Sequence, residues 1–142
     1  MNMIYDVMIL GAGPAGLSAA LYAGRSGLSV LLIGKGADGG QIAVTDEIEN
    51  YPGQMVDGES GPSLIERMTK QVEKFGAERV SDTIVSVDIE GPVKTLVGSN
   101  GTYKARTLII ATGAFPRPIG CKGEGEFMGK GVSYCATCDA SF

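Results

Sequence analysis

Two cysteines near the end of the chain are the residues best suited to chemistry. They lie in the segment Cys135-Ala136-Thr137-Cys138-Asp139, where two residues separate the thiols and a carboxylate follows directly. At this spacing the sulfurs can close a small disulfide ring, so the segment indicates a redox pair, with two unpaired structural thiols as the alternative. A structural zinc site is disfavoured because it needs about four Cys or His ligands. The sequence offers only Cys121 besides this pair, and no histidine.

Asp139 is expected to move protons rather than to activate a thiol. A nearby carboxylate disfavours the thiolate form of a cysteine, so nucleophile activation is not its natural task. A carboxyl group that gives a proton to a departing thiolate, and takes it back on the return step, fits general acid/base catalysis. The alternative is a solvated aspartate.

A glycine pattern near the N-terminus predicts a dinucleotide site. Gly11, Gly13 and Gly16 follow an apolar run at residues 5–10 and open a segment, residues 14–26, with helical spacing. In that context Gly11 can make the sharp turn, Gly13 can admit a pyrophosphate to the backbone, and Gly16 can let helix and strand approach closely. The helix N-terminus would offer free N–H groups to the phosphates. The alternative is a plain tight turn.

The acid that usually binds the ribose at the end of the second strand is missing, because Gly34 and Lys35 occupy its place. Lys35 could face a phosphate or could be a solvated loop lysine. Gln41, which follows Gly39 and Gly40, could meet a ring edge or a ribose through its amide, or could be an ordinary loop residue.

The remaining pattern predicts an α/β fold of the Rossmann type. A continuous apolar run at residues 28–33 predicts a buried parallel strand, and residues 34–54 predict a long functional loop. Pro62 predicts a helix start, with a capping box from Ser63 to Glu66 and an apolar face ending at Gly76. The members of that face are Leu64, Ile65, Met68, Val72 and Phe75.

Short strands are predicted at residues 79–80, 84–89, 93–97 and 102–104, with a tight turn at Asn100-Gly101, and together they suggest a small antiparallel sheet. Residues 107–111 predict another buried strand of the central parallel sheet. We therefore expect residues 1–113 to form a nucleotide-binding domain and a linker to begin near residue 114.

Charge and composition exclude some classes of binding partner. The formal net charge is −4 and no cluster of Lys and Arg is present, which disfavours nucleic acid. No apolar stretch approaches the length of a membrane span, and the first residues lack a basic export signal. Three cysteines without such a signal suit a reducing compartment, so we expect a cytoplasmic protein.

The order of these segments resembles the low-molecular-weight bacterial thioredoxin reductases, FAD enzymes of the pyridine nucleotide-disulfide oxidoreductase superfamily. The resemblance covers nearly the whole chain. It rests on five motifs in order: residues 11–17, residues 39–41, residues 48–53, residues 108–114 and residues 131–139.

The resemblance implies a set of site residues. Cys135 and Cys138 would pass electrons from reduced flavin to thioredoxin, with Cys138 nearer the flavin ring and Asp139 as proton donor. FAD would be bound at the pyrophosphate by Gly11, Gly13, Pro14, Ala15 and Gly16, along its ADP and flavin sides by Gly34, Lys35, Gly40, Gln41 and Asn50, and at the sheet edge by Thr112 and Gly113.

The resemblance also implies that residues 1–113 are the first segment of a discontinuous FAD-binding domain. Residues 114–142 would be a linker and the truncated beginning of the domain that binds NADPH and carries the redox disulfide. The chain would then be the N-terminal portion of a longer homodimeric enzyme, whose NADPH site would lie mostly beyond Phe142. Alone, such a portion is expected to lack NADPH turnover and to hold FAD weakly or not at all. The alternatives are a related flavoprotein that reduces a peroxidase partner or takes electrons from ferredoxin, and a non-catalytic nucleotide-binding module.

Overall fold

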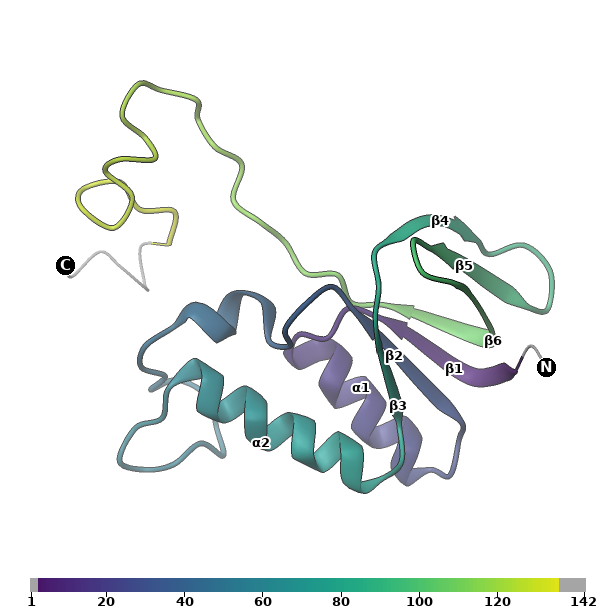
Figure 1. The fold of residues 1–142 in the computed structure, drawn as a ribbon. Helices are drawn as coiled ribbons and strands as arrows, with labels where there is room; N and C mark the ends of the chain where they lie inside the picture. Colours follow the sequence, from purple (N-terminus) through teal and green to yellow (C-terminus); the bar gives the residue numbers. More distant parts are fainter. Residues whose placement is uncertain (1–2, 136–142) are drawn as a thin grey trace.

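A six-stranded mixed sheet forms the centre of the protein in the computed structural model, which describes residues 3–135 (Figure 1). The strand order is β3-β2-β1-β6-β5-β4. Strands β3, β2, β1 and β6 run parallel, and β5 and β4 are added antiparallel beyond β6. The strands are β1 Ile4–Leu10, β2 Val30–Gly34, β3 Glu78–Ser81, β4 Ile84–Asp88, β5 Lys94–Gly98 and β6 Thr102–Ile110.

Two helices, α1 (Pro14–Arg25) and α2 (Gly61–Lys74), cover one face of the parallel strands (Figure 1). They bury a single apolar cluster against that face, because the apolar side chains of each helix lie on one stripe. The predicted stripe of α2 is confirmed except at Phe75, which ends the helix and is 39% exposed. The fully or nearly fully buried members of the cluster are Ile9, Leu17, Ala20, Val30, Leu32 and Leu64.

The start of α2 differs from the predicted capping box. Ser60 is the N-cap, and its hydroxyl accepts the N–H of Ser63 at 3.3 Å. The Ser63 hydroxyl donates instead to the buried carboxylate of Glu59, and Glu66 pairs with Lys70 one turn further along the helix. The helix therefore begins one residue before Pro62, which lies in its first turn.

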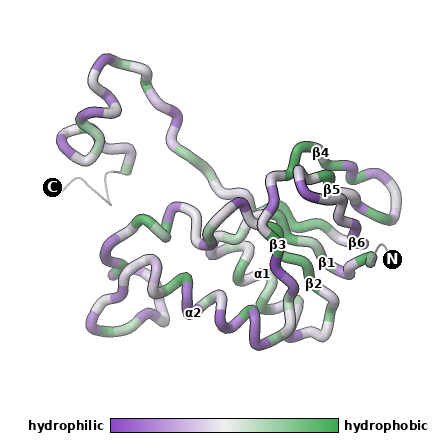
Figure 2. Tube along the Cα trace, viewed as in Figure 1, coloured by the Kyte–Doolittle hydropathy of each residue, from purple (hydrophilic) through white to green (hydrophobic). Residues whose placement is uncertain are grey.

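The opposite face of the parallel strands carries a second buried apolar cluster. Leu96 of β5 and Ala105 of β6 are fully buried against Met8, Leu31 and Ile33 of the parallel strands. In Figure 2 much of β1 and β2 is green, as expected for strands buried on both faces. The two clusters place the core on either side of β1 and β2.

Strand β6 corrects two predictions. The segments predicted as a hairpin strand at residues 102–104 and a separate buried strand at residues 107–111 are one continuous strand. Its first part pairs with β5 on one edge, while most of its length pairs with β1 on the other. Its last residues are not buried, because Ile109 and Ile110 are 38% and 63% exposed. Since β5 ends its pairing at Ala105, no strand among residues 3–135 pairs with the outer edge of residues 106–110.

The long segment after β2 also contains an element that its lack of periodicity did not predict. A short 3-10 helix, η1 (Gly40–Val44), follows Gly39, whose φ of 108° is in the left-handed region. The strand before it begins at Val30 rather than Leu28, because Ser29 is held by the carboxylate of Asp6, which accepts its N–H and its hydroxyl.

Residues 111–135 leave the sheet and extend away from the sheet and helices as an arm (Figure 1). The end of the arm is folded on itself. The buried carboxylate of Glu124 accepts the N–H groups of Ile119 and Gly120 at 2.8 and 2.6 Å, and Met128 and Val132 form a backbone bridge. Among the described residues, none of the helices has the length and apolar character needed to cross a membrane.

Candidate functional site

The glycine-rich loop lies at the carboxyl end of β1, where it turns directly into α1. Gly11 has a φ of 114°, and a Cβ atom there would lie 2.1 Å from the carbonyl oxygen of Ala111. A Cβ atom on Gly16 would lie 1.8 Å from the carbonyl oxygen of Gly11. Both glycines are therefore required by the fold itself, Gly11 for the turn and Gly16 for the close approach of α1.

Gly13 is different. Its φ of −81° suits any residue, and the nearest atom to a Cβ there would be the carbonyl oxygen of Gly39 at 3.8 Å. The protein thus leaves open the space that a side chain at this position would fill. Such empty space beside a glycine allows a ligand to approach the backbone closely.

The N-terminus of α1 suits an anionic ligand. Gly13 is the N-cap and supplies no side-chain cap, Pro14 occupies the first turn, and that turn holds no acidic residue. The first N–H groups of a helix lack intrahelical partners and carry a partial positive charge of about half a unit. Together with Ala15, which is exposed, the loop has the backbone geometry that holds a pyrophosphate.

Two further segments meet this loop at the same edge of the sheet. The N–H of Gly39 donates to the carbonyl of Ala12 at 2.8 Å, so the turn at Gly39 and Gly40 lies against the loop. The N–H of Ala111 donates to the carbonyl of Leu10 at 2.8 Å, which brings Thr112 and Gly113 to the carboxyl end of β1. In open α/β sheets this edge is where nucleotides bind.

Gln41 links those two segments. Its side-chain amide donates from Nε2 to the carbonyl of Ala114 at 2.7 Å, across 73 residues of sequence. The contact ties η1 to the chain that leaves β6, next to Gly113, whose φ is 69°. Sequence alone could not foresee this partner for Gln41.

The end of β2 leaves no space for a side chain at position 34. Gly34 is buried, and a Cβ atom there would lie 2.8 Å from the Cβ of Ala12. Lys35 is exposed at the start of the following loop. An acid at the usual ribose position is thus sterically excluded at residue 34 and replaced by a cation at residue 35.

Asp38 and Arg79 are residues that sequence reasoning missed here. Asp38 Oδ1 accepts a hydrogen bond from Arg79 Nε at 2.8 Å and forms an ion pair with Arg79 Nη2 at 2.6 Å. Asp38 Oδ2 accepts from the Thr69 hydroxyl at 3.3 Å. The guanidinium also donates to the carbonyl of Gly36 at 3.1 Å. The only sequence signal was an acid three residues beyond Lys35 in a glycine-rich loop.

Asn50 lies in the loop between η1 and α2, where it is exposed and its side chain has no hydrogen bond among residues 3–135. That loop is anchored to α2 by the pairing of Glu59 with Arg67. Glu59 accepts from Arg67 Nε at 2.8 Å and Nη2 at 2.7 Å, and the hydrogen bond from Arg67 lowers the pKa of the Glu59 carboxyl.

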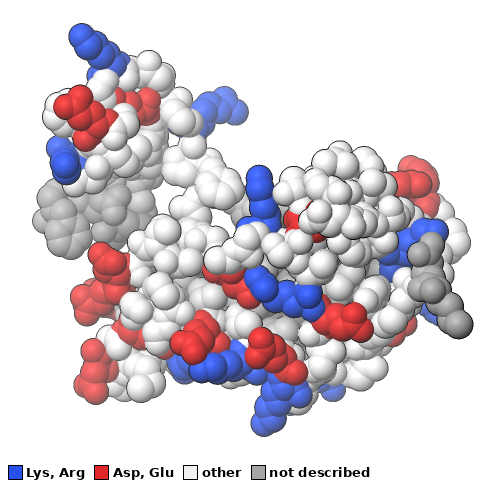
Figure 3. Space-filling view, in the orientation of Figure 1, with Lys and Arg blue, Asp and Glu red and all other residues white. Residues whose placement is uncertain are grey.

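Acidic side chains gather over the same loop (Figure 3), around a shallow hollow of about 350 Å³. The negative charges of these carboxylates would repel a pyrophosphate. Within residues 3–135 no group of three His, Cys, Asp or Glu side chains could hold a metal ion. The residues that line the hollow are Glu47, Glu49, Gln54, Val56, Asp57 and Gly58.

Of the predicted redox residues, only Cys135 lies in the described part of the chain, at the end of the arm. Its N–H donates to the Ser133 hydroxyl at 3.1 Å. Cys138 and Asp139 lie outside the described residues. Cys121, which the sequence left without a partner, is an exposed free thiol on the arm.

Known proteins match all or nearly all of the chain. The family model described as pyridine nucleotide-disulphide oxidoreductase matches residues 5–142. A thioredoxin reductase from Peptoclostridium litorale is 56% identical over 142 residues, and a glucosaminate ammonia-lyase from Pseudomonas fluorescens is 52% identical over 136 residues. The crystal structure of thioredoxin reductase from Streptococcus pyogenes MGAS5005 superposes with a TM-score of 0.86 at 46% identity over the full chain.

These relatives are longer than the chain. It spans 45% of the Peptoclostridium protein, 42% of the Pseudomonas protein and 46% of the Streptococcus chain. The coverage agrees with the expectation that the sequence corresponds to one part of a longer protein.

Proposed function

Because the chain belongs to the pyridine nucleotide-disulphide oxidoreductase family, we propose that it forms the FAD-binding part of a thioredoxin-disulfide reductase. The space left open at Gly13, beside the uncapped start of α1, is the observation that carries the proposal. Gly11 and Gly16 are explained by the fold without a ligand, whereas Gly13 is not. The thioredoxin reductase from Peptoclostridium litorale, which is 56% identical to this chain, supports the same function.

The residues of the loop would hold the pyrophosphate of FAD. Gly13, Ala15 and Gly16 carry N–H groups at the start of α1. These backbone groups would donate hydrogen bonds to the phosphate oxygens. Gly39 and Gly40 on one side, and Thr112 and Gly113 on the other, would flank the nucleotide. When bound, FAD supplies transfer of two electrons from NADPH to a disulfide.

The redox pair would act as the acceptor of those electrons. Two electrons and two protons convert a Cys135–Cys138 disulfide to two thiols, and a thiolate of the pair then attacks the thioredoxin disulfide to form a mixed disulfide. The carboxyl group of Asp139 would give a proton to the departing thiolate. The cysteine remaining in the pair then displaces reduced thioredoxin.

We extend the proposal to a homodimer that works in the cytoplasm with NADPH as donor and thioredoxin as partner, and without nucleic acid or membrane. The support is the acidic net charge of −4, the absence of clustered basic residues and the thioredoxin reductases among the relatives. Residues 1–113 would be the first segment of the FAD domain, and residues 114–142 would begin the NADPH domain.

The test uses the protein at its natural length. We expect flavin absorbance after purification, and NADPH-dependent reduction of thioredoxin that is lost in Cys138→Ser while NADPH still bleaches the flavin. Cys121→Ser is the matched control and should retain full turnover, because Cys121 is an exposed thiol outside the pair. A protein without flavin, or a Cys138→Ser variant with normal thioredoxin reduction, would contradict the proposal.

The Pseudomonas relative motivates a second candidate, release of ammonia from glucosaminate. The same preparations distinguish the two functions. Ammonia release from glucosaminate without thioredoxin reduction would favour this second candidate. Thioredoxin reduction with reduced ferredoxin but not with NADPH would instead correct the electron donor.

A further inference from the structure

The end of the arm closes into a loop directly before Cys135. The N–H of Ile119 donates to the Tyr134 hydroxyl at 3.2 Å, across 15 residues of sequence, and also to Glu124 Oε1 at 2.8 Å. One N–H shared between two acceptors forms a three-centre hydrogen bond. The two ends of residues 119–134, which we call the closed loop, therefore meet at this N–H, and Cys135 is the next residue.

Glu124 is a buried carboxylate that the proposed electron transfer does not use. The residue is 8% exposed, and its Oε2 accepts the N–H of Gly120 at 2.6 Å in addition to the bond from Ile119. Burial of a carboxylate is costly unless hydrogen bonds replace its water. The two N–H groups replace that water only while residues 119–120 stay against Glu124. Glu124 therefore holds Ile119 where the Tyr134 hydroxyl can reach it.

Backbone hydrogen bonds tie the interior of the closed loop. The N–H of Phe127 donates to the carbonyl of Gly123 at 3.0 Å. The N–H groups of Lys130 and Val132 both donate to the carbonyl of Phe127, at 2.8 and 2.9 Å. These bonds join residues of the same short segment, so the closed loop has a shape of its own although it extends away from the sheet and helices (Figure 1).

Ser133 carries this constraint to Cys135. The Ser133 hydroxyl accepts the N–H of Cys135 at 3.1 Å and donates to the carbonyl of Cys135 at 3.1 Å. A serine hydroxyl that binds the backbone two residues further along forms a local turn. Both backbone polar groups of Cys135 are thus bound by a side chain at the end of the closed loop. The backbone is restrained where the chain enters the redox segment.

We propose that Glu124 and Tyr134 are positioning residues for the proposed redox pair. Through Ser133, the closed loop holds Cys135 in the backbone conformation from which its disulfide with Cys138 closes. The inference rests on the proposed function. Holding one thiol in place raises its effective concentration at the other, which favours the disulfide over the dithiol. A pair without the closed loop is therefore easier to reduce.

The test measures the equilibrium between the pair and dithiothreitol in the natural-length protein, without oxygen. The two thiols of the pair give two electrons and two protons to oxidised dithiothreitol, which becomes the dithiol, and the reverse reaction opens the protein disulfide. After equilibration, free thiols are alkylated and counted by mass spectrometry. Trypsin cuts after Lys130, so Cys121 falls on a different peptide from Cys135.

Tyr134→Phe keeps the ring and removes only the hydroxyl contact with Ile119. We expect the equilibrium to shift toward the dithiol roughly two- to tenfold, the range of one hydrogen bond. Ser133→Ala should shift it in the same direction. Glu124→Gln should do so too, because an amide NH2 group replaces one of the two acceptors and faces an N–H. A merely structural role would lower the unfolding midpoint and leave this equilibrium unchanged.

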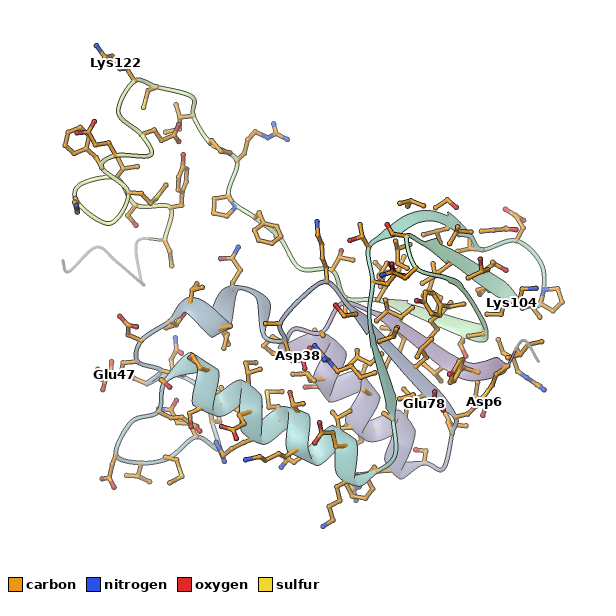
Figure 4. The ribbon with its side chains drawn as sticks, viewed as in Figure 1. Asp6, Asp38, Glu47, Glu78, Lys104 and Lys122 are labelled. Carbon is orange, nitrogen blue, oxygen red and sulfur yellow. The ribbon has the colours of Figure 1, made fainter. Side chains whose placement is uncertain are left out.

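Glu126→Gln is the matched control, because Glu126 is an exposed acid of the same loop without an ion pair or hydrogen bond within residues 3–135. Lys122→Gln is a second control, because Lys122 lies at the outer end of the arm and points away from the sheet and helices (Figure 4). Both should keep the equilibrium of the unaltered protein.

The outcome for Tyr134→Phe decides the inference even if Glu124→Gln does not fold. An unchanged equilibrium in Tyr134→Phe, a shift toward the disulfide, or an equal shift in Glu126→Gln overturns the inference alone. An unaltered protein whose pair is not reversibly oxidised by dithiothreitol overturns it together with the proposed function.

Discussion

Alanine at Gly13 and at Gly16 should separate ligand binding from folding. The two glycines are three residues apart in the same loop, yet a Cβ atom has 3.8 Å of space at Gly13 and meets the Gly11 carbonyl oxygen at 1.8 Å at Gly16. Gly16→Ala must push α1 away from β1, where the neighbouring Leu17 is 1% exposed. Overpacking of this kind costs about 1–3 kcal/mol or more of folding stability.

Gly13→Ala should cost little stability. Its φ of −81° and ψ of −177° are allowed for alanine. A loss of up to about 1 kcal/mol at the N-cap is offset by a gain of roughly 0.4–1 kcal/mol from the stiffer unfolded chain. The new methyl group would instead occupy the space of the pyrophosphate. If this steric overlap costs about 1–3 kcal/mol of binding free energy, the affinity for FAD falls roughly 5- to 150-fold.

Two measurements on the natural-length protein decide the matter. Denaturant unfolding of the apoprotein gives the free energy of unfolding, and titration of flavin fluorescence gives the FAD affinity. We expect Gly16→Ala to lose stability and Gly13→Ala to keep stability but lose affinity. The reasoning is refuted if Gly13→Ala is destabilised as strongly as Gly16→Ala, or if it binds FAD as tightly as the unaltered protein.

Two titrations follow from the side-chain contacts of the sheet. Burial acts to raise the pKa of Asp82, but hydrogen bonds from the Tyr103 hydroxyl and nearby backbone N–H groups prevail and lower it. The Asp82 carboxylate therefore stabilises the fold above its unfolded pKa, and this stabilisation is lost as the pH falls through its folded pKa. Tyr103→Phe should therefore reduce the loss of stability on the acid side, measured as unfolding midpoint against pH, and an unchanged acid limb would count against this role. Burial and the hydrogen bond to Glu78 raise the pKa of Tyr5 to about 12, so its contribution is complete below the unfolded pKa of 10.0 and is lost as the pH rises through about 12. Tyr5→Phe should remove a Tyr absorbance change in that range; persistence of the full change would show that another tyrosine titrates there.

The features that depend only on neighbouring residues could be predicted from the sequence alone. The strand, glycine turn and helix at residues 4–25 could be predicted because a left-handed turn at Gly11 and an apolar stripe depend on neighbouring residues only. The same holds for α2, whose stripe repeats with the helical period. The cysteine spacing in residues 135–139 is likewise a property of sequence, although Cys138 and Asp139 lie outside the described residues.

Tertiary structure decided the features that join distant segments. Strand β6 is one strand rather than two because β1 and β5 pair with overlapping parts of it. The Arg79–Asp38 ion pair and the hydrogen bond from Gln41 to Ala114 span 41 and 73 residues. No periodicity encodes such contacts, since they depend on which strands become neighbours. The contact of Arg79 with the carbonyl of Gly36, in the loop that carries Lys35, likewise depends on the pairing of β3 with β2.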